Sequence, residues 1–212
     1  MKKLYYLLPL LCLALTACNT EKQMAKKYQQ AAALYNAKQY TKALPLLTKA
    51  ANSGNTDAQL MLAKCYDFGY GTPTNMQAAI KWYTIAANAG NDNAMDNLGT
   101  CYATGSGVKT NLYKAFQLYN QAAAQGNVSA LNNLGLCYLN GEGTAPSTEK
   151  AAQCFQRAAS KGNADAQFNL GRCYEHGLGL PIDPEQAHYW VSKAAKQGHK
   201  NAIEYLKEST WE

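Results

Sequence analysis

Cysteine is the residue type with the clearest chemical potential in this chain. Of its seven cysteines, four recur at intervals of 36 residues: Cys65, Cys101, Cys137 and Cys173. Equivalent residues of adjacent repeats are expected to lie about 10 Å or more apart, too far for a disulfide bond. One prediction is that these cysteines are buried as small hydrophobic side chains. The alternative, in an oxidising compartment, is a disulfide from a fifth cysteine, Cys154, to Cys137 or Cys173. No cysteines have the close spacing of zinc ligands, so no metal site is predicted.

A second chemical motif is Ser147-Thr148-Glu149-Lys150, which matches the Ser-x-x-Lys nucleophile motif of penicillin-recognising enzymes. The companion motifs Ser-Asp-Asn and Lys-Thr-Gly are absent from the sequence. Ser147 also falls on a position that the equivalent segments fill with Asn or Asp, which are residue types that begin helices. We therefore interpret Ser147 as a helix cap and predict no catalytic residue and no enzyme activity.

The histidines also lack a catalytic or metal-binding pattern. His176, His188 and His199 show neither the spacing of metal ligands nor an acid–base pair among them. They are interpreted as exposed surface and turn residues, and no cofactor is predicted.

The N-terminus has the pattern of an export signal. Lys2 and Lys3 precede an apolar run from Leu4 to Leu15, which is too short to span a membrane comfortably. The following Leu15-Thr16-Ala17-Cys18 resembles the bacterial lipobox, in which the cysteine is acylated and becomes the first residue of the mature protein. Residues 1–17 are therefore predicted to be a lipoprotein signal peptide. The alternative is an ordinary cleaved signal with an incidental cysteine.

Lipidation would set the location of the protein. Several acyl chains such as palmitate on Cys18 would anchor it firmly, whereas one chain binds a membrane only marginally. Asn19 follows the cysteine, and by resemblance to enterobacterial sorting the lack of Asp there favours the outer membrane, facing the periplasm. Residues 18–24 are predicted to be the lipidated cysteine and a short tether, so the rest of the chain would lie close to the bilayer.

The elements that would position these side chains follow from an internal repeat. Residues 90–107 read Gly-Asn-x-x-Ala-x-x-x-Leu-Gly-x-Cys-Tyr-x-x-Gly-x-Gly, and the same residue types return twice at later steps of 36 and once earlier. The earliest copy has Ala63 in place of the inner glycine. A fixed period of this length indicates stacked structural repeats.

Each repeat is predicted to contain two helices. The first follows a Gly-Asn pair and ends at a left-handed glycine, and the second begins at a cap of its own. These positions are the first-helix caps Asn55, Asn91, Asn127 and Asn163, the terminal glycines Gly69, Gly105, Gly141 and Gly177, and the second-helix caps Asn75, Asn111, Ser147 and Asp183.

Glycines inside the first helices need a packing reason, because Gly there costs about 1 kcal/mol relative to Ala. Their recurrence at Gly99, Gly135 and Gly171 suits a helix crossing that is too close for a β-carbon. The double alanines of the second helices, such as Ala86-Ala87, are predicted to form the other side of this crossing.

The ends of the array depart from the repeat. A first hairpin without the Gly-x-Gly loop is predicted from helices at about 25–38 and 42–51. A shorter helix at about 201–207 is predicted to cap the C-terminus, after Gly198-His199, where the Asn cap is lost. The repeat domain is therefore expected to cover residues 25–212.

These motifs resemble the Sel-1-like repeat family, a branch of the tetratricopeptide-type α-solenoids, over roughly residues 40–200. The resemblance implies an all-α fold, a right-handed α-solenoid of stacked helical hairpins. It would contain about four 36-residue repeats, an N-terminal tetratricopeptide-like hairpin and a C-terminal capping helix. It also implies a concave face, lined by the first helices, that holds other proteins or peptides.

The resemblance also suggests binding residues. Asn97, Asn133 and Asn169 align with the asparagine by which tetratricopeptide domains hold a peptide backbone or carboxylate. The alternative is that these asparagines serve a neighbouring helix. One position after the inner glycine the residue type varies, and Arg172 and Lys64 at that position are expected to pair with acidic groups of a partner.

The predicted function is a non-catalytic protein–protein interaction scaffold of the bacterial cell envelope. An alternative is a binder or hydrolase of peptidoglycan or β-lactams. A related group of cysteine-rich Sel-1-like proteins, which carry two bridged cysteines per repeat, includes proteins described as β-lactamases or penicillin binders. The second cysteine of each repeat is absent here. A structural spacer without a ligand is a third possibility.

The charge argues against nucleic acid as a partner. The formal net charge is +6 and includes Lys2 and Lys3 of the predicted signal peptide. The remainder, about +4, is too mild and too scattered along the sequence to indicate a nucleic-acid-binding surface.

Overall fold

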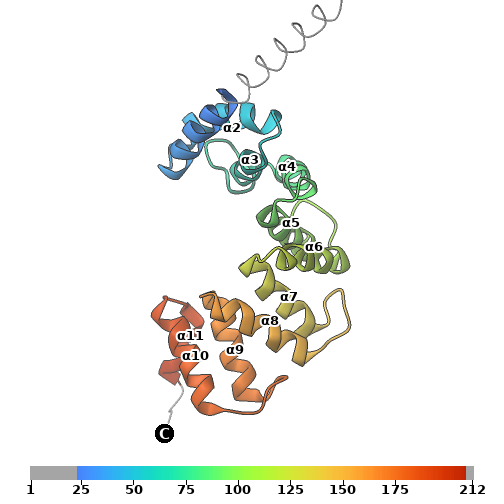
Figure 1. Ribbon diagram of the computed structural model, residues 1–212, viewed down its shortest axis with the longest axis vertical. Helices are drawn as coiled ribbons and strands as arrows, with labels where there is room; N and C mark the ends of the chain where they lie inside the picture. The colour runs from blue at the N-terminus through green and yellow to red at the C-terminus, as the bar shows by residue number, and fades with distance from the viewer. Residues whose placement is uncertain (1–22, 209–212) are drawn as a thin grey trace, which may run out of the picture. The chain divides into compact units, whose positions relative to one another are not determined.

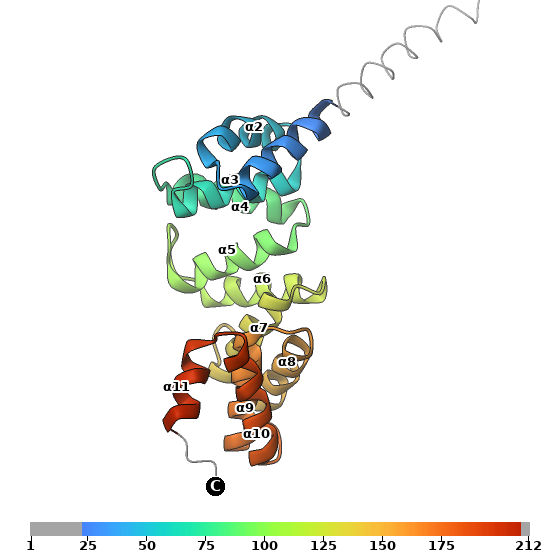
Figure 2. The same ribbon diagram turned by 90° about the vertical axis from the view of Figure 1, so that its left-hand side faces the viewer.

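The computed structural model describes residues 23–208 and is all-helical over that range (Figures 1 and 2). The helices are residues 23–36, α2 (Tyr40–Asn52), α3 (Thr56–Phe68), α4 (Met76–Asn88), α5 (Asp92–Thr104), α6 (Leu112–Ala124), α7 (Val128–Asn140), α8 (Thr148–Ser160), α9 (Ala164–His176), α10 (Pro184–Lys196) and α11 (Lys200–Glu208). Corresponding helices of successive repeats begin 36 residues apart, so the predicted series of helical hairpins is confirmed. The predicted signal peptide and Cys18 lie outside the described residues.

The chain forms two compact units. The first is Met1–Asn91 and the second is Asp92–Glu212, so the division falls between two repeats. Nothing in the unbroken 36-residue register of the sequence marks this boundary. The first unit contains the hairpin of residues 23–36 and α2 and the hairpin of α3 and α4. The second contains three hairpins, α5–α6, α7–α8 and α9–α10, followed by α11.

The helix boundaries follow the predicted capping chemistry. The side chains of Asn55, Asn127 and Asn163 accept hydrogen bonds of 2.8, 2.9 and 2.7 Å from the backbone N–H three residues later. All four second-helix caps accept the equivalent bond: Asn75, Asn111, Ser147 and Asp183. The glycines that end the first helices adopt the left-handed conformation, with φ of 73° at Gly69 and 68° at Gly177. Local sequence therefore sets where these helices start and stop.

The close helix crossing at the inner glycines is present, but its partner differs from the prediction. The atoms nearest to a β-carbon built on Gly99 belong to the ring of Tyr119, at 2.8 Å, and those nearest to Gly135 belong to the ring of Phe155, at 2.6 Å. At Gly171 the nearest atom is Cγ2 of Val191, also at 2.6 Å. The double alanines are therefore not the opposing side. The opposing side is one bulky residue, which enters the space that each glycine leaves.

The double alanines instead lie against the helix that follows them. Ala158 and Ala159 at the end of α8 are fully buried, and the carbonyl of Ala159 accepts a 3.2 Å hydrogen bond from Nε2 of Gln167 on α9. In the first unit, Gln59 on α3 donates a 3.1 Å bond to Ala51 of α2 in the same way. Small side chains at these positions let the next first helix approach closely enough for this bond.

The long loop inside a repeat rests on the preceding repeat. A β-carbon on Gly143 would overlap the backbone of Leu112 at the start of α6, and one on Gly179 would overlap the backbone of Thr148 at the start of α8. Both glycines have positive φ, 74° and 71°. Two features therefore require a glycine as the second glycine of the Gly-x-Gly loop: its left-handed conformation and its close contact with a neighbouring helix.

The two ends agree with the predicted hairpin and cap, with one correction. The first hairpin turns at residues 37–39, where Lys38 is left-handed with φ of 58°. At the other end, the asparagine cap is absent as predicted, but His199 replaces it. Nδ1 of His199 accepts a 3.1 Å hydrogen bond from the backbone N–H of Ala202, so the imidazole caps α11 as asparagine caps the equivalent helices.

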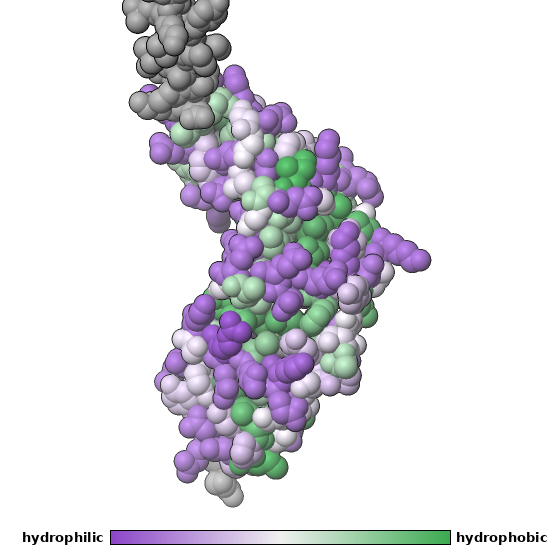
Figure 3. All heavy atoms as spheres, turned by 45° about the vertical axis from the view of Figure 1, so that its right-hand side comes forward, coloured by the Kyte–Doolittle hydropathy of each residue, from purple (hydrophilic) through white to green (hydrophobic). Residues whose placement is uncertain are grey.

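Figure 3 shows one face on which hydrophilic residues predominate and smaller hydrophobic areas lie between them. None of the helices within residues 23–208 is both long and apolar enough to cross a membrane.

Candidate functional site

The first helices of the second unit are tied to one another by a ladder of side chains. Nδ2 of Asn133 on α7 donates a 2.9 Å hydrogen bond to Oδ1 of Asp96 on α5. One repeat later, Nδ2 of Asn169 on α9 donates a bond of the same length to Oδ1 of Asn132 on α7. We call these four residues the amide ladder. It links α5, α7 and α9 through one polar row.

The ladder shows what the asparagines do within the chain. The predicted alternative, that they serve a neighbouring helix, describes Asn133 and Asn169, because each uses one amide N–H for its bond to the preceding repeat. An asparagine amide has a second N–H and a carbonyl oxygen. Both side chains are only half-buried, so the chain does not fully enclose these remaining groups. Asn97, at the equivalent position of α5, is also half-buried.

The partners of the ladder were missed from the sequence. Asp96 and Asn132 stand one position before Asn97 and Asn133, so each ladder bond spans 37 residues instead of the 36 of the repeat. The signal was present, because a polar residue precedes the asparagine in two successive repeats. Only the relative rotation of two helices shows that these positions meet.

The two predicted basic residues lie in different units. Arg172 is exposed on α9, where one guanidinium nitrogen lies 3.4 Å from Nε2 of His176. Lys64 is half-buried on α3 in the first unit. In the second unit, exposed Thr100 and half-buried Leu136 occupy the position of Arg172 on α5 and α7. This position therefore places a different side chain beside the ladder in each repeat.

An aromatic cluster lies next to the amide ladder at the C-terminal end of the array. The rings of Phe168 and His199 stack with centroids 4.9 Å apart, and Tyr205 of α11 meets Phe168 edge to face. The Tyr205 hydroxyl donates a hydrogen bond to Glu175, and Nε2 of His199 lies 3.2 Å from Oδ1 of Asp165. His199 is therefore held in the structure, contrary to the prediction of an exposed turn residue. His188 and His176 are exposed.

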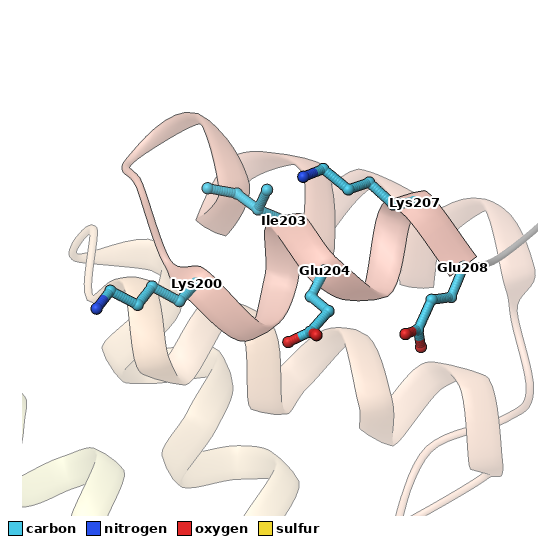
Figure 4. Close-up of a pocket in the computed structure, with 5 residues that line it drawn as sticks. All are labelled: Lys200, Ile203, Glu204, Lys207 and Glu208. Atoms are coloured by element: carbon cyan, nitrogen blue, oxygen red, sulfur yellow. The ribbon is translucent and has the colours of Figure 1, made fainter.

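The outer face of α11 carries both positive and negative charges. In Figure 4, Glu204 and Glu208 point to one side of α11, while Ile203 and Lys207 point away from them. With Lys200 these side chains line a shallow pocket of about 370 Å³. A polar outer face of this kind ends a repeat array without exposing its core.

The described cysteines are buried and form no disulfide. Cys65, Cys101, Cys137, Cys154 and Cys173 all lie in the interior, and the structure does not contain the disulfide considered between Cys154 and Cys137 or Cys173. Burial raises the pKa of Cys65, Cys137 and Cys173 to about 11 and also raises the pKa of Cys154. Thiolate is the nucleophilic form of cysteine, so a raised pKa makes these four thiols less nucleophilic at neutral pH.

The Ser-x-x-Lys motif is structural. Oγ of Ser147 accepts the backbone N–H of Lys150 at 3.3 Å and donates to Glu149 at 3.0 Å. The Lys150 ammonium lies 5.3 Å from the centre of the Tyr138 ring. The hydroxyl thus caps α8, and the lysine that would activate a nucleophile interacts with an aromatic face. Within the described residues, no group of three or more His, Cys, Asp or Glu side chains could hold a metal ion.

A comparison with family models agrees with this repeat structure. The Sel1 repeat model matches residues 37–55, 56–91, 92–127, 128–163 and 164–199, which is well over half of the chain. The chain belongs to the Sel1 repeat family. The family boundaries coincide with the starts of α3, α5, α7 and α9. Sel1 repeat proteins in general bind protein partners, and the family is generally non-catalytic.

Solved structures with the same architecture come from several bacteria. A Sel1 repeat protein from Oxalobacter formigenes is 33% identical, with a TM-score of 0.79, and the match covers 86% of this chain and 76% of that chain. A protective antigen of uropathogenic Escherichia coli that displays an SLR fold is 29% identical, with a TM-score of 0.77, covering 86% of this chain and 40% of that one. An immunity protein from Pseudomonas aeruginosa is 25% identical, with a TM-score of 0.57, and the coverage is 85% and 68%. None of the curated proteins compared with the chain matches it.

Proposed function

We propose that this Sel1 repeat protein is a non-catalytic scaffold of the bacterial cell envelope that binds an extended protein segment along the first helices of its second unit. The amide ladder is the observation that carries the proposal. It holds the half-buried amides of Asn133 and Asn169 in two successive repeats, and half-buried Asn97 occupies the equivalent place on α5. Amides can both donate to and accept from a peptide backbone. A partner bound along this row would be recognised mainly by its main chain.

Specificity would come from the variable positions beside the ladder. Thr100, Leu136 and Arg172 offer a hydroxyl, an aliphatic side chain and a guanidinium at equivalent places. Arg172 would favour an acidic side chain or a terminal carboxylate, since guanidinium–carboxylate bonds are among the strongest hydrogen bonds in proteins. The partner segment is therefore expected to carry a negative charge where it crosses α9.

The envelope location rests on the N-terminal sequence. Residues 1–17 have the pattern of a lipoprotein signal peptide and Cys18 that of a lipid-attachment site. The protein would be anchored through this cysteine, with the outer membrane favoured. Mass spectrometry of the N-terminal peptide from the membrane fraction checks the acylation, and Cys18→Ser is expected to release the protein into the soluble fraction.

Site-specific crosslinking in cells tests the binding face. Photo-crosslinking residues at positions 100, 140 and 172 sample exposed sites on α5, α7 and α9, and positions 153 and 186 on α8 and α10 serve as controls. We expect one protein partner to crosslink from the first-helix positions and not from the controls. Equal crosslinking from both sets, or no saturable partner, would contradict the proposal.

A second measurement addresses the absence of catalysis. The purified protein is expected not to hydrolyse a chromogenic β-lactam, because Ser147 and Lys150 are not arranged as nucleophile and base. Turnover by the natural protein that is lost in Ser147→Ala would overturn the non-catalytic assignment.

A further inference from the structure

Within residues 23–208, the excess of positive charge lies entirely in the first hairpin, residues 23–52. Residues 23–52 contain five lysines and no aspartate or glutamate. Residues 53–91 contain two lysines and two aspartates, and residues 92–208 contain ten basic and ten acidic residues. Both later segments are therefore neutral. The charge is therefore not scattered as predicted, because the whole excess lies on the first hairpin.

The five lysines are displayed at the surface of this hairpin. Lys26 and Lys27 lie on the helix of residues 23–36, Lys38 is in the turn, and Lys42 and Lys49 lie on α2. All of them are exposed except Lys27, which is half-buried. Because no acidic residue lies within the hairpin, its own side chains provide no anionic partner for these ammonium groups.

Two of the lysines lie close together. The Lys49 side chain on α2 lowers the pKa of Lys27 on the neighbouring helix, through direct contact and charge repulsion. Like charges that meet in this way repel each other, and an external anion would relieve the repulsion. The first acidic residue of the next helix, Asp57, accepts a 3.2 Å hydrogen bond from Asn91. It also interacts with Tyr28 on the helix of residues 23–36, whose pKa is raised by burial and by the charge of Asp57.

We propose that the first hairpin binds the anionic surface of a lipid bilayer. The described part of the hairpin starts at residue 23, five residues after the predicted lipid-attachment site at Cys18, so the intervening segment is short enough to hold it at the headgroups. Basic residues clustered within a Debye length of an anionic leaflet are attracted to it. The neutral second unit, which carries the amide ladder, would gain nothing from the lipid surface and would be left free for a protein partner.

The strength of this attraction can be stated per residue. Each lysine near an anionic leaflet strengthens binding by about fivefold at physiological salt. Removing two of the five lysines should therefore weaken binding by about 25-fold. The location of the hairpin near a membrane rests on the proposed lipid anchor, but its affinity for anionic lipid does not, because it depends on the hairpin alone.

Vesicle binding by the unlipidated protein tests the proposal separately from the anchor. A protein of residues 19–212, which contains every described residue, is sedimented with phosphatidylcholine vesicles that contain phosphatidylglycerol and with vesicles of phosphatidylcholine alone. We expect binding only to the anionic vesicles, and we expect it to be lost at about 1 M salt, where the Debye length falls to about 3 Å. If Cys18 is not acylated in cells but this binding occurs, the anchor fails and the present inference stands.

Matched double variants distinguish the effect of where the lysines lie from the effect of the total charge of the protein. Lys27→Gln with Lys49→Gln, and independently Lys38→Gln with Lys42→Gln, should each weaken binding about 25-fold. Lys196→Gln with Lys200→Gln removes the same charge from exposed positions of the second unit and should change binding by less than about twofold. Circular dichroism confirms that each variant is folded.

Three outcomes would overturn the inference. The first is equal binding to neutral vesicles. The second is an equal loss of binding in the control variant, which would show that net charge matters and its position does not. The third is binding to an acidic polypeptide such as polyglutamate without binding to anionic vesicles, which would assign the hairpin to an acidic protein partner.

Discussion

At the scale of single residues, each inner glycine is matched to one residue of the following helix. Tyr119 and Phe155 enter the space at Gly99 and Gly135 with flexible rings, whereas Gly171 faces both the Val191 side chain and the carbonyl of Ala187, 3.0 Å from the built β-carbon. A ring can tilt away from an added methyl group, but a helix backbone cannot move without shifting the whole helix. Equivalent glycines therefore differ in how strictly they are required.

The first repeat shows how an alanine is accommodated at this position. Ala63 occupies the place of Gly99, and Tyr83 occupies the place of Tyr119. The Tyr83 hydroxyl donates to Asp67 at 2.9 Å, whereas that of Tyr119 donates to Thr100 at 3.1 Å. With an alanine present, the tyrosine hydroxyl bonds to a residue three positions further along the first helix.

We predict that Gly171→Ala destabilises the protein more than Gly99→Ala. Overpacking against backbone should cost Gly171→Ala about 1–3 kcal/mol. In Gly99→Ala, rotation of the Tyr119 ring and the higher helix propensity of alanine should limit the loss in free energy of unfolding to less than about 1 kcal/mol. Urea unfolding of both variants measures the difference. Equal losses of stability would show that ring motion does not relieve the clash.

A buried glutamine defines a second residue-scale feature. Gln167 is fully satisfied, because its Nε2 donates to Ala159 and its Oε1 accepts a 2.7 Å bond from Gln197. The equivalent Gln59 is 5% exposed, and its Oε1 has no partner in the structure. The position of Gln197 is filled by exposed Ala89 in that repeat, so the donor is missing from the sequence there.

We therefore predict that Ala89→Gln stabilises the first unit. A glutamine there can donate to Oε1 of Gln59 as Gln197 does to Gln167, which should add about 0.5–1.5 kcal/mol. The reverse change, Gln197→Ala, should cost about 1–3 kcal/mol, because it leaves a buried acceptor unpaired. Thermal unfolding of both variants checks the pair, and Ala89→Asn, whose side chain is too short, serves as the control. A melting temperature unchanged in Ala89→Gln would contradict the comparison of the two repeats.

At the scale of helices, the caps were the most predictable feature and the crossings the least. Asn and Gly at fixed spacing decided the starts and ends of helices such as α7 and α9, because capping involves residues only a few positions apart. The partner of each inner glycine lies 20 residues away on another helix, and its identity depends on how that helix is rotated. Tyr119 could not be distinguished from the nearby alanines without that rotation.

The start of α11 shows that a histidine can cap a helix at a position where the repeat pattern expects asparagine. His199 stands where earlier repeats have asparagine, and its ring nitrogen takes over the same role while Nε2 faces Asp165. This arrangement requires the neutral tautomer in which Nε2 carries the proton and Nδ1 accepts. Capping is thus defined by where an acceptor atom lies, and a list of preferred residue types misses this case.

We predict that His199→Asn preserves α11 and His199→Ala weakens it. Asparagine supplies the same acceptor in the other repeats, whereas alanine removes it at a cost of about 1 kcal/mol. Hydrogen exchange of the amides of residues 202–206 is expected to accelerate in His199→Ala and to stay near the natural rate in His199→Asn. Equal acceleration in both variants would mean that stacking on Phe168, and not the cap, holds the helix.

At the scale of the whole molecule, the two compact units differ in the number of hairpins that support them. The second has three complete hairpins and α11, whereas the first has two hairpins. Repeat proteins are stabilised by their internal packing and by the interfaces between neighbouring repeats, and about three repeats are needed for independent stability. The 36-residue period predicted the repeat count from sequence, but the division at Asn91 depends on tertiary packing that the period does not express.

We predict that residues 92–212 fold alone and residues 19–91 do so only marginally. The separate second unit should show helical circular dichroism and one cooperative thermal transition, because its three hairpins and end helix match what independent stability requires. The separate first unit should melt at a lower temperature and with a broader transition. A second unit that is unfolded until residues 19–91 are restored would show that its stability comes from outside its own repeats.

The Gly-x-Gly loops also limit how such a gene can grow or shrink. Gly143 and Gly179 each lie against the first residues of the second helix in the preceding repeat, so each of these two loops needs a complete neighbour upstream. A duplication or deletion of one whole 36-residue block recreates that contact at the new junction, whereas a fragment of any other length removes it. Length variants in this protein's lineage are therefore expected to differ by integral multiples of the block, wherever in the array the recombination occurred.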